Sequence, residues 1–222
     1  MATLRIVSYN IHGQRDDQAA LDEVVRDLAP DVLVLQEAPR RFRWRQHCAA
    51  LARRFRLVYA VGGLPALGNL ILVDLRVSVE RTWCLRFPLT PGRLMRGAAV
   101  AHCAVAGRRF VVAGSHLSTD PLERPAQARR LRQELVIVDE PLVLALDVND
   151  EPESETWKVL ADGLVDAGAE PGTPTFPARG PRRRIDAVLV DPRLPVAAHR
   201  VVDTPTARRA SDHLPVLTEL TW

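Results

Sequence analysis

The feature that most limits the possible folds of this chain is a series of eleven short apolar runs rich in Val, Leu and Ile. Their length and composition predict β-strands. We place these strands at residues 3–9, 31–36, 56–61, 69–74, 77–86, 97–105, 109–114, 142–146, 185–190, 196–202 and 214–220. Because one strongly twisted open sheet rarely holds so many strands, two sheets packed face to face are expected.

Helical patterns separate some of these strands, at residues 17–28, 40–54, 123–136 and 153–162. In the first of them, Leu21, Val24, Val25 and Leu28 form one apolar stripe that would pack against a sheet. The expected fold is therefore α+β, a two-sheet β-sandwich flanked by helices in four layers, α/β/β/α. With 222 residues, 47% of them hydrophobic, we expect one domain that spans residues 1–222.

Charge and cysteine content exclude some functional classes. The 30 basic and 27 acidic residues leave a net charge of +3, which is too small to identify a nucleic-acid-binding protein from bulk electrostatics. Lys158 is the only lysine, so part of the arginine content reflects the codon bias of a GC-rich genome. The three cysteines are widely spaced and include no C-x-x-C pair, which argues against a disulfide framework or a zinc knuckle.

The N-terminal segment predicts no targeting signal. Residues 3–9 alternate like a strand and lack the long apolar run of a signal peptide. No run reaches the length of about 20 apolar residues that a membrane span needs. We therefore expect a cytoplasmic protein with no membrane span, and we expect a monomer.

Polar residues that are costly to bury stand at the ends of several predicted strands. They are Asn10, Glu37, His116, Asp147, Asn149, Asp186, Asp212 and His213. Each one alone is more easily explained as a helix cap or a turn residue. Together, however, carboxylates, amides and imidazoles suit a site for a hard metal ion such as Mg²⁺ or Mn²⁺. The G-x-S-x-G, G-x-x-x-x-G-K-[ST] and H-E-x-x-H motifs of other enzyme classes are absent from the sequence.

The order of these residues resembles the endonuclease/exonuclease/phosphatase superfamily, which includes deoxyribonucleases, abasic-site endonucleases, neutral sphingomyelinases and inositol-polyphosphate phosphatases. The motifs are Ser8-Tyr9-Asn10-Ile11-His12-Gly13, Leu35-Gln36-Glu37, Gly68-Asn69-Leu70-Ile71-Leu72, Ser115-His116-Leu117, Leu146-Asp147-Val148-Asn149, Arg184-Ile185-Asp186 and Ser211-Asp212-His213. The resemblance covers nearly the whole chain and implies the same two-sheet sandwich and a phosphoesterase that depends on Mg²⁺ or Mn²⁺.

The resemblance also implies a role for each site residue. Glu37 would be the principal metal ligand, with Asn10 beside it and Asp212 near the ion. Asp147 would orient the attacking water, Asn149 would donate to the phosphoryl oxygens, Asp186 would pair with His213, and His116 would reach the phosphate. We expect Asn69, His12, Arg183 and Arg184 to contact the substrate, although His12 could instead cap the first strand.

Three departures from the family pattern matter. Leu146 stands where the family usually has glycine before Asp147, which predicts a backbone less open to substrate. His12 stands where some members have aspartate, which puts a second metal ion in doubt. The chain is also short for the family, without the long insertions that relatives use to recognise duplex DNA or inositide rings.

Arginines beside the predicted site favour a polyanionic substrate. They form three groups, at residues 40–45, 182–184 and 208–209, and such a basic rim would bind nucleic acid in a salt-dependent way. The first group also fits an exposed helical face, and Trp44, Trp83 and Trp157 fit a partly buried core better than base stacking. We expect a phosphodiesterase acting on nucleic acid. The alternatives are a small phosphate ester (nucleotide, inositide or lipid headgroup) as substrate, or a non-catalytic binding module.

Overall fold

The structure is a computed structural model, and it describes residues 3–222. Within these residues the strands are β1 (Thr3–Asn10), β2 (Val32–Gln36), β3 (Val58–Gly63), β4 (Asn69–Val73), β5 (Ser78–Arg86), β6 (Gly97–Val105), β7 (Arg108–His116), β8 (Leu142–Asp147), β9 (Val165–Asp166), β10 (Asp186–Val190), β11 (Val196–Val201) and β12 (Val216–Thr221). The helices are α1 (Gln18–Leu28), α2 (Trp44–Phe55), α3 (Arg124–Leu135), α4 (Glu155–Ala161) and α5 (Ala207–Ala210), with a 3₁₀ turn at His12–Gln14.

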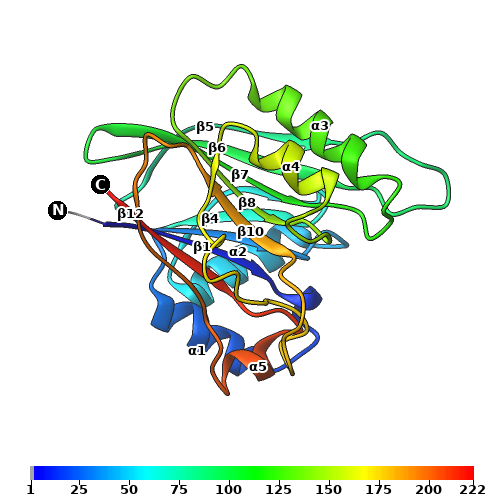
Figure 1. The fold of residues 1–222 in the computed structure, drawn as a ribbon. Helices are drawn as coiled ribbons and strands as arrows, with labels where there is room; N and C mark the ends of the chain where they lie inside the picture. Colours follow the sequence, from blue (N-terminus) through cyan, green and yellow to red (C-terminus); the bar gives the residue numbers. More distant parts are fainter. Residues whose placement is uncertain (1–2) are drawn as a thin grey trace.

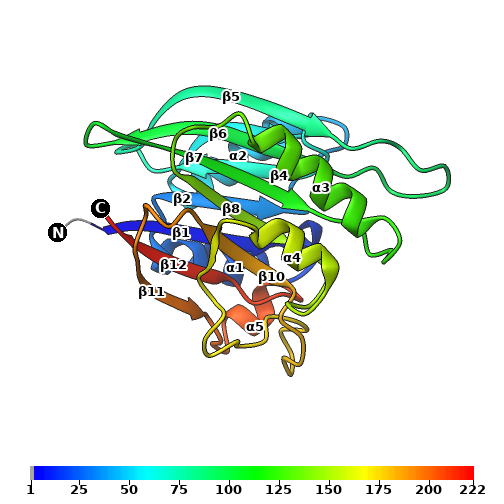
Figure 2. The same cartoon turned by 45° about the horizontal axis from the view of Figure 1, so that its top comes forward.

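The strands form two mixed sheets of six strands each (Figures 1 and 2). One sheet has the order β11-β12-β1-β2-β4-β3, and the other has the order β5-β6-β7-β8-β10-β9. In both sheets one parallel pair lies near the centre, β1 with β2 and β7 with β8. The sheets stack on each other, as expected from the number of apolar runs.

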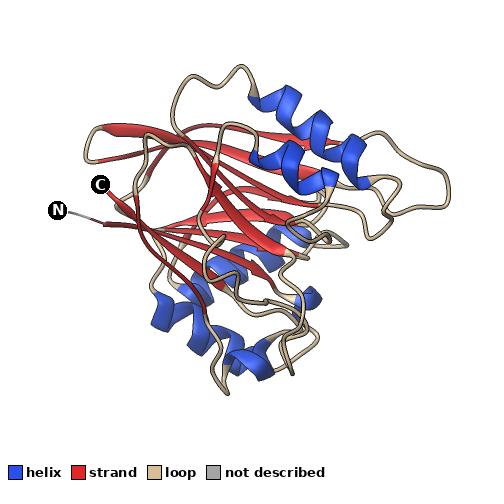
Figure 3. Cartoon of the chain, in the orientation of Figure 1, coloured by secondary structure: helices blue, strands red, loops and turns tan. Residues whose placement is uncertain are grey.

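Helices cover the outer face of each sheet, which confirms the four-layer α/β/β/α arrangement (Figure 3). One apolar cluster joins α1, α2 and α5 to the first sheet, and another joins α3 and α4 to the second sheet. A third cluster, which includes Ile6, Val34, Val112 and Val188, fills the space between the sheets. None of the described helices is long and apolar enough to cross a membrane.

Strand alternation directs the terminal polar residues into the space between the sheets. In β1, β7, β8 and β10, every second residue belongs to the inter-sheet cluster, and each strand ends or begins with a polar residue in the same phase. These four residues are Asn10, His116, Asp147 and Asp186. Leu146 has the opposite phase and is buried among the residues that face α3 and α4. It therefore points away from the side of the sheet that carries Asp147.

The structure differs from the sequence prediction at one helix start and at two short elements. Helix α2 begins at Trp44 rather than at residue 40, because Arg43 adopts a left-handed backbone with a φ of 57°. Arg40, Arg41 and Arg43 therefore lie in a loop that directly follows Glu37. Strand β9 has two residues and α5 has four, and neither is long enough to show a periodic pattern.

Candidate active site

Asp147 lies at the centre of the polar group between the sheets. Its strand β8 pairs with β7 in a register that places His116 beside it, and with β10 in a register that places Asp186 on its other side. Asn10 reaches across from the other sheet and donates its Nδ2 to Asp147 Oδ2 over 2.8 Å. Residues from distant parts of the sequence thus meet at one edge of the sandwich.

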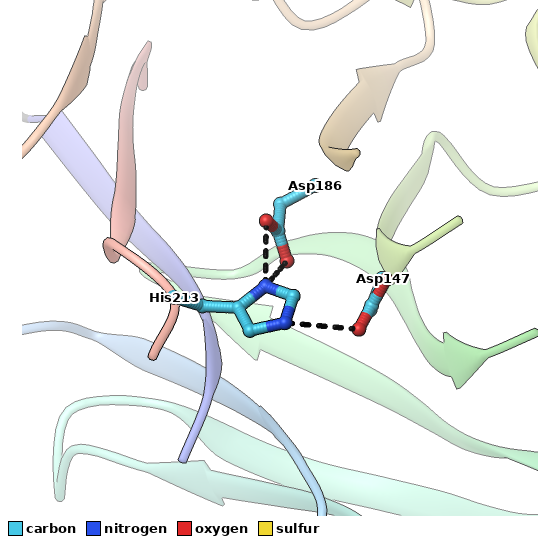
Figure 4. Close-up of side chains that lie close together, drawn as sticks. All are labelled: Asp147, Asp186 and His213. Atoms are coloured by element: carbon cyan, nitrogen blue, oxygen red, sulfur yellow. Dashed lines mark hydrogen bonds and ion pairs between the residues drawn. The ribbon is translucent and has the colours of Figure 1, made fainter. Parts of the chain in front are cut away.

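The carboxylate of Asp147 is 1% exposed and is held by several donors. Its Oδ1 accepts the backbone N–H of Asn149 at 3.0 Å. Its Oδ2 lies 3.2 Å from His116 Nε2 and 3.7 Å from His213 Nε2, the latter drawn in Figure 4. The 3.7 Å separation is too long for a direct hydrogen bond.

His213 forms a buried couple with Asp186, whose carboxylate oxygens lie 3.0 and 3.2 Å from Nδ1 (Figure 4). Burial lowers the pKa of His213, but the negative charges of Asp186, Asp147 and Asp212 outweigh it and raise this pKa to about 10. The imidazole is therefore protonated at neutral pH. The ring of Phe176 packs against it with centroids 4.8 Å apart, which fixes its orientation.

His116 has the opposite charge state although it contacts the same carboxylate. Burial lowers its pKa to about 3, because the attraction of Asp147 does not offset the loss of solvent and the repulsion from Arg96, His213 and Arg40. At neutral pH His116 is uncharged, and its Nε2 is the ring nitrogen that lies beside Asp147. One cationic and one neutral imidazole thus flank Asp147.

Glu37, Asn10 and Asp212 lie at the same edge as the buried group and offer oxygen ligands. Glu37 follows Gln36, which pairs with Asn10 across β1 and β2. The charges of Glu37 and Asp147 both act on Arg96, so the two carboxylates lie in the same region. The side chain of Asp212 is 39% exposed. A set of two carboxylates and one amide oxygen suits Mg²⁺ or Mn²⁺, so these residues could hold a divalent ion together.

A second group, Asp147, Asp186 and His213, has its ligand atoms within 4.8 Å of one another and also has the composition of a metal site. We favour the Glu37 group, however, because a protonated imidazole has no lone pair for a metal ion, and Nδ1 of His213 already contacts Asp186.

Arg96 is a functional candidate that the sequence did not reveal. It is 8% exposed, directly precedes β6, and its Nε has no hydrogen-bond partner in the described structure. Burial lowers the pKa of Arg96, while the nearby charges of Asp147 and Glu37 act against that change. A buried guanidinium with an unused donor beside these carboxylates suits an anionic substrate. Among so many arginines, only its position at the start of an apolar strand could have singled it out.

The other expected substrate contacts differ in their surroundings. The guanidinium of Arg184 donates to both oxygens of Asp166, at 3.0 and 2.7 Å, and stacks on Trp157. This placement does not favour substrate contact by Arg184. Arg183 is exposed, with only Glu151 at 3.6 Å. Asn69 is buried, and its Nδ2 donates to the carbonyl oxygens of Ala66 and Gly97. The Nδ2 of Asn149 donates to the Leu117 carbonyl oxygen.

Backbone-binding hydroxyls that the sequence analysis did not consider connect the segments of this site. Ser211 Oγ donates to the carbonyl oxygen of Asn10 at 2.7 Å and accepts the backbone N–H of His213 at 3.3 Å. Thr175 Oγ1 accepts the backbone N–H of Asp186. The Ser-Asp-His motif contained Ser211, and its spacing could have indicated this positioning role.

Comparisons with known proteins identify the family of this chain. A model described as the Endonuclease/Exonuclease/phosphatase family matches residues 7–213. No curated protein matches the chain in sequence.

Several solved structures have a similar fold. TDP2 of D. rerio, complexed with a single strand DNA product, is 20% identical over 100% of both chains, with a TM-score of 0.82. A mannosyl-6-phosphatase of Bacteroides thetaiotaomicron is 17% identical over 99% of this chain and 100% of that chain, with a TM-score of 0.79. An endonuclease/exonuclease/phosphatase from Beutenbergia cavernae is 25% identical over 99% of this chain and 72% of that chain, with a TM-score of 0.78.

Proposed function

The chain belongs to the endonuclease/exonuclease/phosphatase family and is a phosphoric ester hydrolase that depends on a divalent metal ion, and we propose that it hydrolyses phosphodiester bonds of nucleic acid by direct attack of water. The observation that supports this reaction most strongly is the convergence of Asn10, His116, Asp186 and His213 on the carboxylate of Asp147. The preferred ion is Mg²⁺ or Mn²⁺.

In this proposal Asp147 accepts a proton from the attacking water, whose oxygen forms the new bond to phosphorus. His213, kept protonated by Asp186, donates to a phosphoryl oxygen or to the departing oxygen as the old P–O bond breaks. His116, Arg96 and the free amide hydrogen of Asn149 stabilise the charge that accumulates on the phosphoryl oxygens. A divalent ion held by Glu37, Asn10 and Asp212 would add Lewis-acid stabilisation of the same charge.

Removal of the metal ion tests the reaction class. We expect EDTA-treated protein to lose at least about a hundredfold in turnover of bis-p-nitrophenyl phosphate, and Mg²⁺ or Mn²⁺ to restore it, because the ion supplies several kcal/mol of charge stabilisation. The measurement is the initial rate before and after metal addition. Turnover that continues unchanged in EDTA would contradict the proposal, and a lack of turnover across a broad panel of phosphate esters would leave only a binding role.

The loop between Glu37 and α2 supports nucleic acid as the substrate. Its Phe42 is 87% exposed, between the exposed side chains of Arg41 and Arg43. Within residues 3–222 neither arginine forms an ion pair with an acidic residue, whereas Arg208 and Arg209 pair with Asp203 and Asp17. Exposed arginines with an aromatic ring suit phosphates and stacked bases.

A double variant of this loop, Arg41→Gln with Arg43→Gln, tests the substrate class. We expect the KM for a single-stranded oligonucleotide to rise about tenfold at low salt, and the slope of log affinity against log salt to fall by about 1.4, because each phosphate contact to a single strand contributes about 0.7. Turnover of bis-p-nitrophenyl phosphate should stay unchanged, because this diester has no neighbouring phosphates or bases for the loop to bind.

The matched control is Arg53→Gln with Arg56→Gln, at the exposed opposite end of α2. It removes the same charge and should leave the oligonucleotide KM unchanged. Equal effects of the two double variants would show that only net charge matters. Efficient, salt-insensitive turnover of a small phosphate ester would favour the alternative substrate class.

A further inference from the structure

His12 lies at the mouth of the proposed metal site and is not used by the mechanism above. Its backbone N–H donates to Asn10 Oδ1 at 3.0 Å, so the residue is anchored on a proposed ligand. Its side chain is 30% exposed and can be reached by an ion from solvent.

The imidazole of His12 has one nitrogen in use and one turned toward the site. Nδ1 lies 2.7 Å from Asp16 Oδ2, a hydrogen bond in which Nδ1 carries the proton. Nε2 lies 3.8 Å from Asp212 Oδ2. A histidine whose outer nitrogen binds a carboxylate while the other faces the ion is the usual arrangement of metal-binding histidines. Nε2 is thus the ring nitrogen on the side of Asp212.

The separation of 3.8 Å between His12 Nε2 and Asp212 Oδ2 is too long for a hydrogen bond between them. It is compatible with two ligands of one ion, because metal–nitrogen and metal–oxygen bonds of about 2.1 Å allow ligand atoms to lie about 3 to 4 Å apart. His12 and Asp212 are therefore already spaced as two ligands of one ion.

We infer that His12 Nε2 is a direct ligand of the catalytic metal ion, and that it biases the site toward Mn²⁺ and other transition ions over Mg²⁺. Imidazole is a ligand of transition metals, whereas Mg²⁺ prefers oxygen ligands. The inference rests on the metal site proposed above, in which Glu37, Asn10 and Asp212 are the other ligands of the ion.

Pulsed EPR of the protein loaded with Mn²⁺ tests ligation directly and requires no turnover. We expect the wild type to show nitrogen modulation from a bound imidazole, and His12→Gln and His12→Asp to lose it. Calorimetric titration should show Mn²⁺ binding weakened about tenfold or more in His12→Gln and in Asp16→Asn, which lacks the supporting carboxylate. His12→Asp should narrow the preference for Mn²⁺ over Mg²⁺.

Two further variants distinguish an error in the proposed metal site from an error in the role of His12. His47→Gln replaces an exposed histidine on α2 and should keep both the nitrogen signal and the affinity. Glu37→Gln should weaken Mn²⁺ binding strongly, and if it does not, the proposed metal site itself is wrong. If Glu37→Gln weakens binding but the nitrogen signal is absent from the wild type or survives in His12→Gln, only the role of His12 is overturned.

Discussion

Replacing Asp147 by asparagine is expected to reduce kcat by about a thousandfold, because the loss of a positioned general base costs two to four orders of magnitude. The amide keeps the size of the side chain and one acceptor oxygen, so it can still accept the backbone N–H of Asn149. It cannot, however, take a proton from water at neutral pH. The substrate KM should change far less than kcat, since the carboxylate acts on the water rather than on the substrate.

The matched control for this variant is Asp191→Asn. Asp191 follows β10 and its backbone N–H donates to the Leu142 carbonyl oxygen, at the opposite end of β8 from Asp147. The variant Asp191→Asn should retain wild-type rates. The measurement is steady-state turnover of bis-p-nitrophenyl phosphate and of an oligonucleotide, with circular dichroism to verify folding. A kcat for Asp147→Asn within about threefold of the wild type would show that Asp147 is not a general base.

The second large effect is expected from Asp186→Asn, which should move the alkaline limb of the pH–rate profile to lower pH. In the wild type, burial lowers the pKa of His213 while Asp186, Asp147 and Asp212 raise it to about 10. The charge of Asp186 is the largest of the effects that raise the pKa of His213. Without it, burial lowers this pKa, so the imidazole loses its proton at a lower pH. We expect kcat to fall about a hundredfold at pH 8 and to recover partly at pH 6.

Direct observation of the imidazole can distinguish this mechanism from a loss of structure. The NMR signals of His213 should titrate near pH 10 in the wild type and at lower pH in Asp186→Asn. His213→Gln, which has no proton to lose in this range, should show low kcat at every pH. A profile for Asp186→Asn that is lowered equally at all pH values would mean that Asp186 acts only by holding the ring in place.

The same coupling has a consequence for stability. Because the folded pKa of His213 is raised from 6.5 to about 10, the protonated couple stabilises the folded chain fully below about pH 6.5, and this contribution is lost as the pH rises toward 10. The melting temperature of the wild type should therefore fall as the pH rises from about 6.5 toward 10. The unfolding of Asp186→Asn should depend less on pH there.

Sequence patterns predicted most of the sandwich because each of its longer strands is an apolar run that can be recognised from the local sequence. A run such as Val32-Leu33-Val34-Leu35 is apolar throughout since both faces of β2 are buried. Glu37 and Asp147 are informative only together with the other polar residues at strand ends, because one carboxylate after a strand can simply cap a helix. The helix expected from residue 40 was less well predicted. Its apolar spacing begins only at Trp44, and the left-handed Arg43 could not be read from composition.

The roles of individual arginines could not be predicted in the same way. Arg96 and Arg184 are both buried, but Arg184 pairs with Asp166 across the fold, whereas the Nε of Arg96 has no partner in the described residues. A single sequence shows neither burial nor pairing between distant segments. The direction of the Leu146 side chain, which packs toward α3 and α4, was likewise not readable from the sequence.

The sequence by itself determined which segments become strands and which polar side chains stand at their ends, because alternation and apolar length are local properties of the chain. The meeting of Asn10, Asp147, Asp186 and His213 depends on strand register and on the stacking of two sheets. Only that stacking removes water from these groups, and burial beside neighbouring charges then makes one histidine cationic and the other neutral. Their protonation states are therefore properties of the tertiary structure.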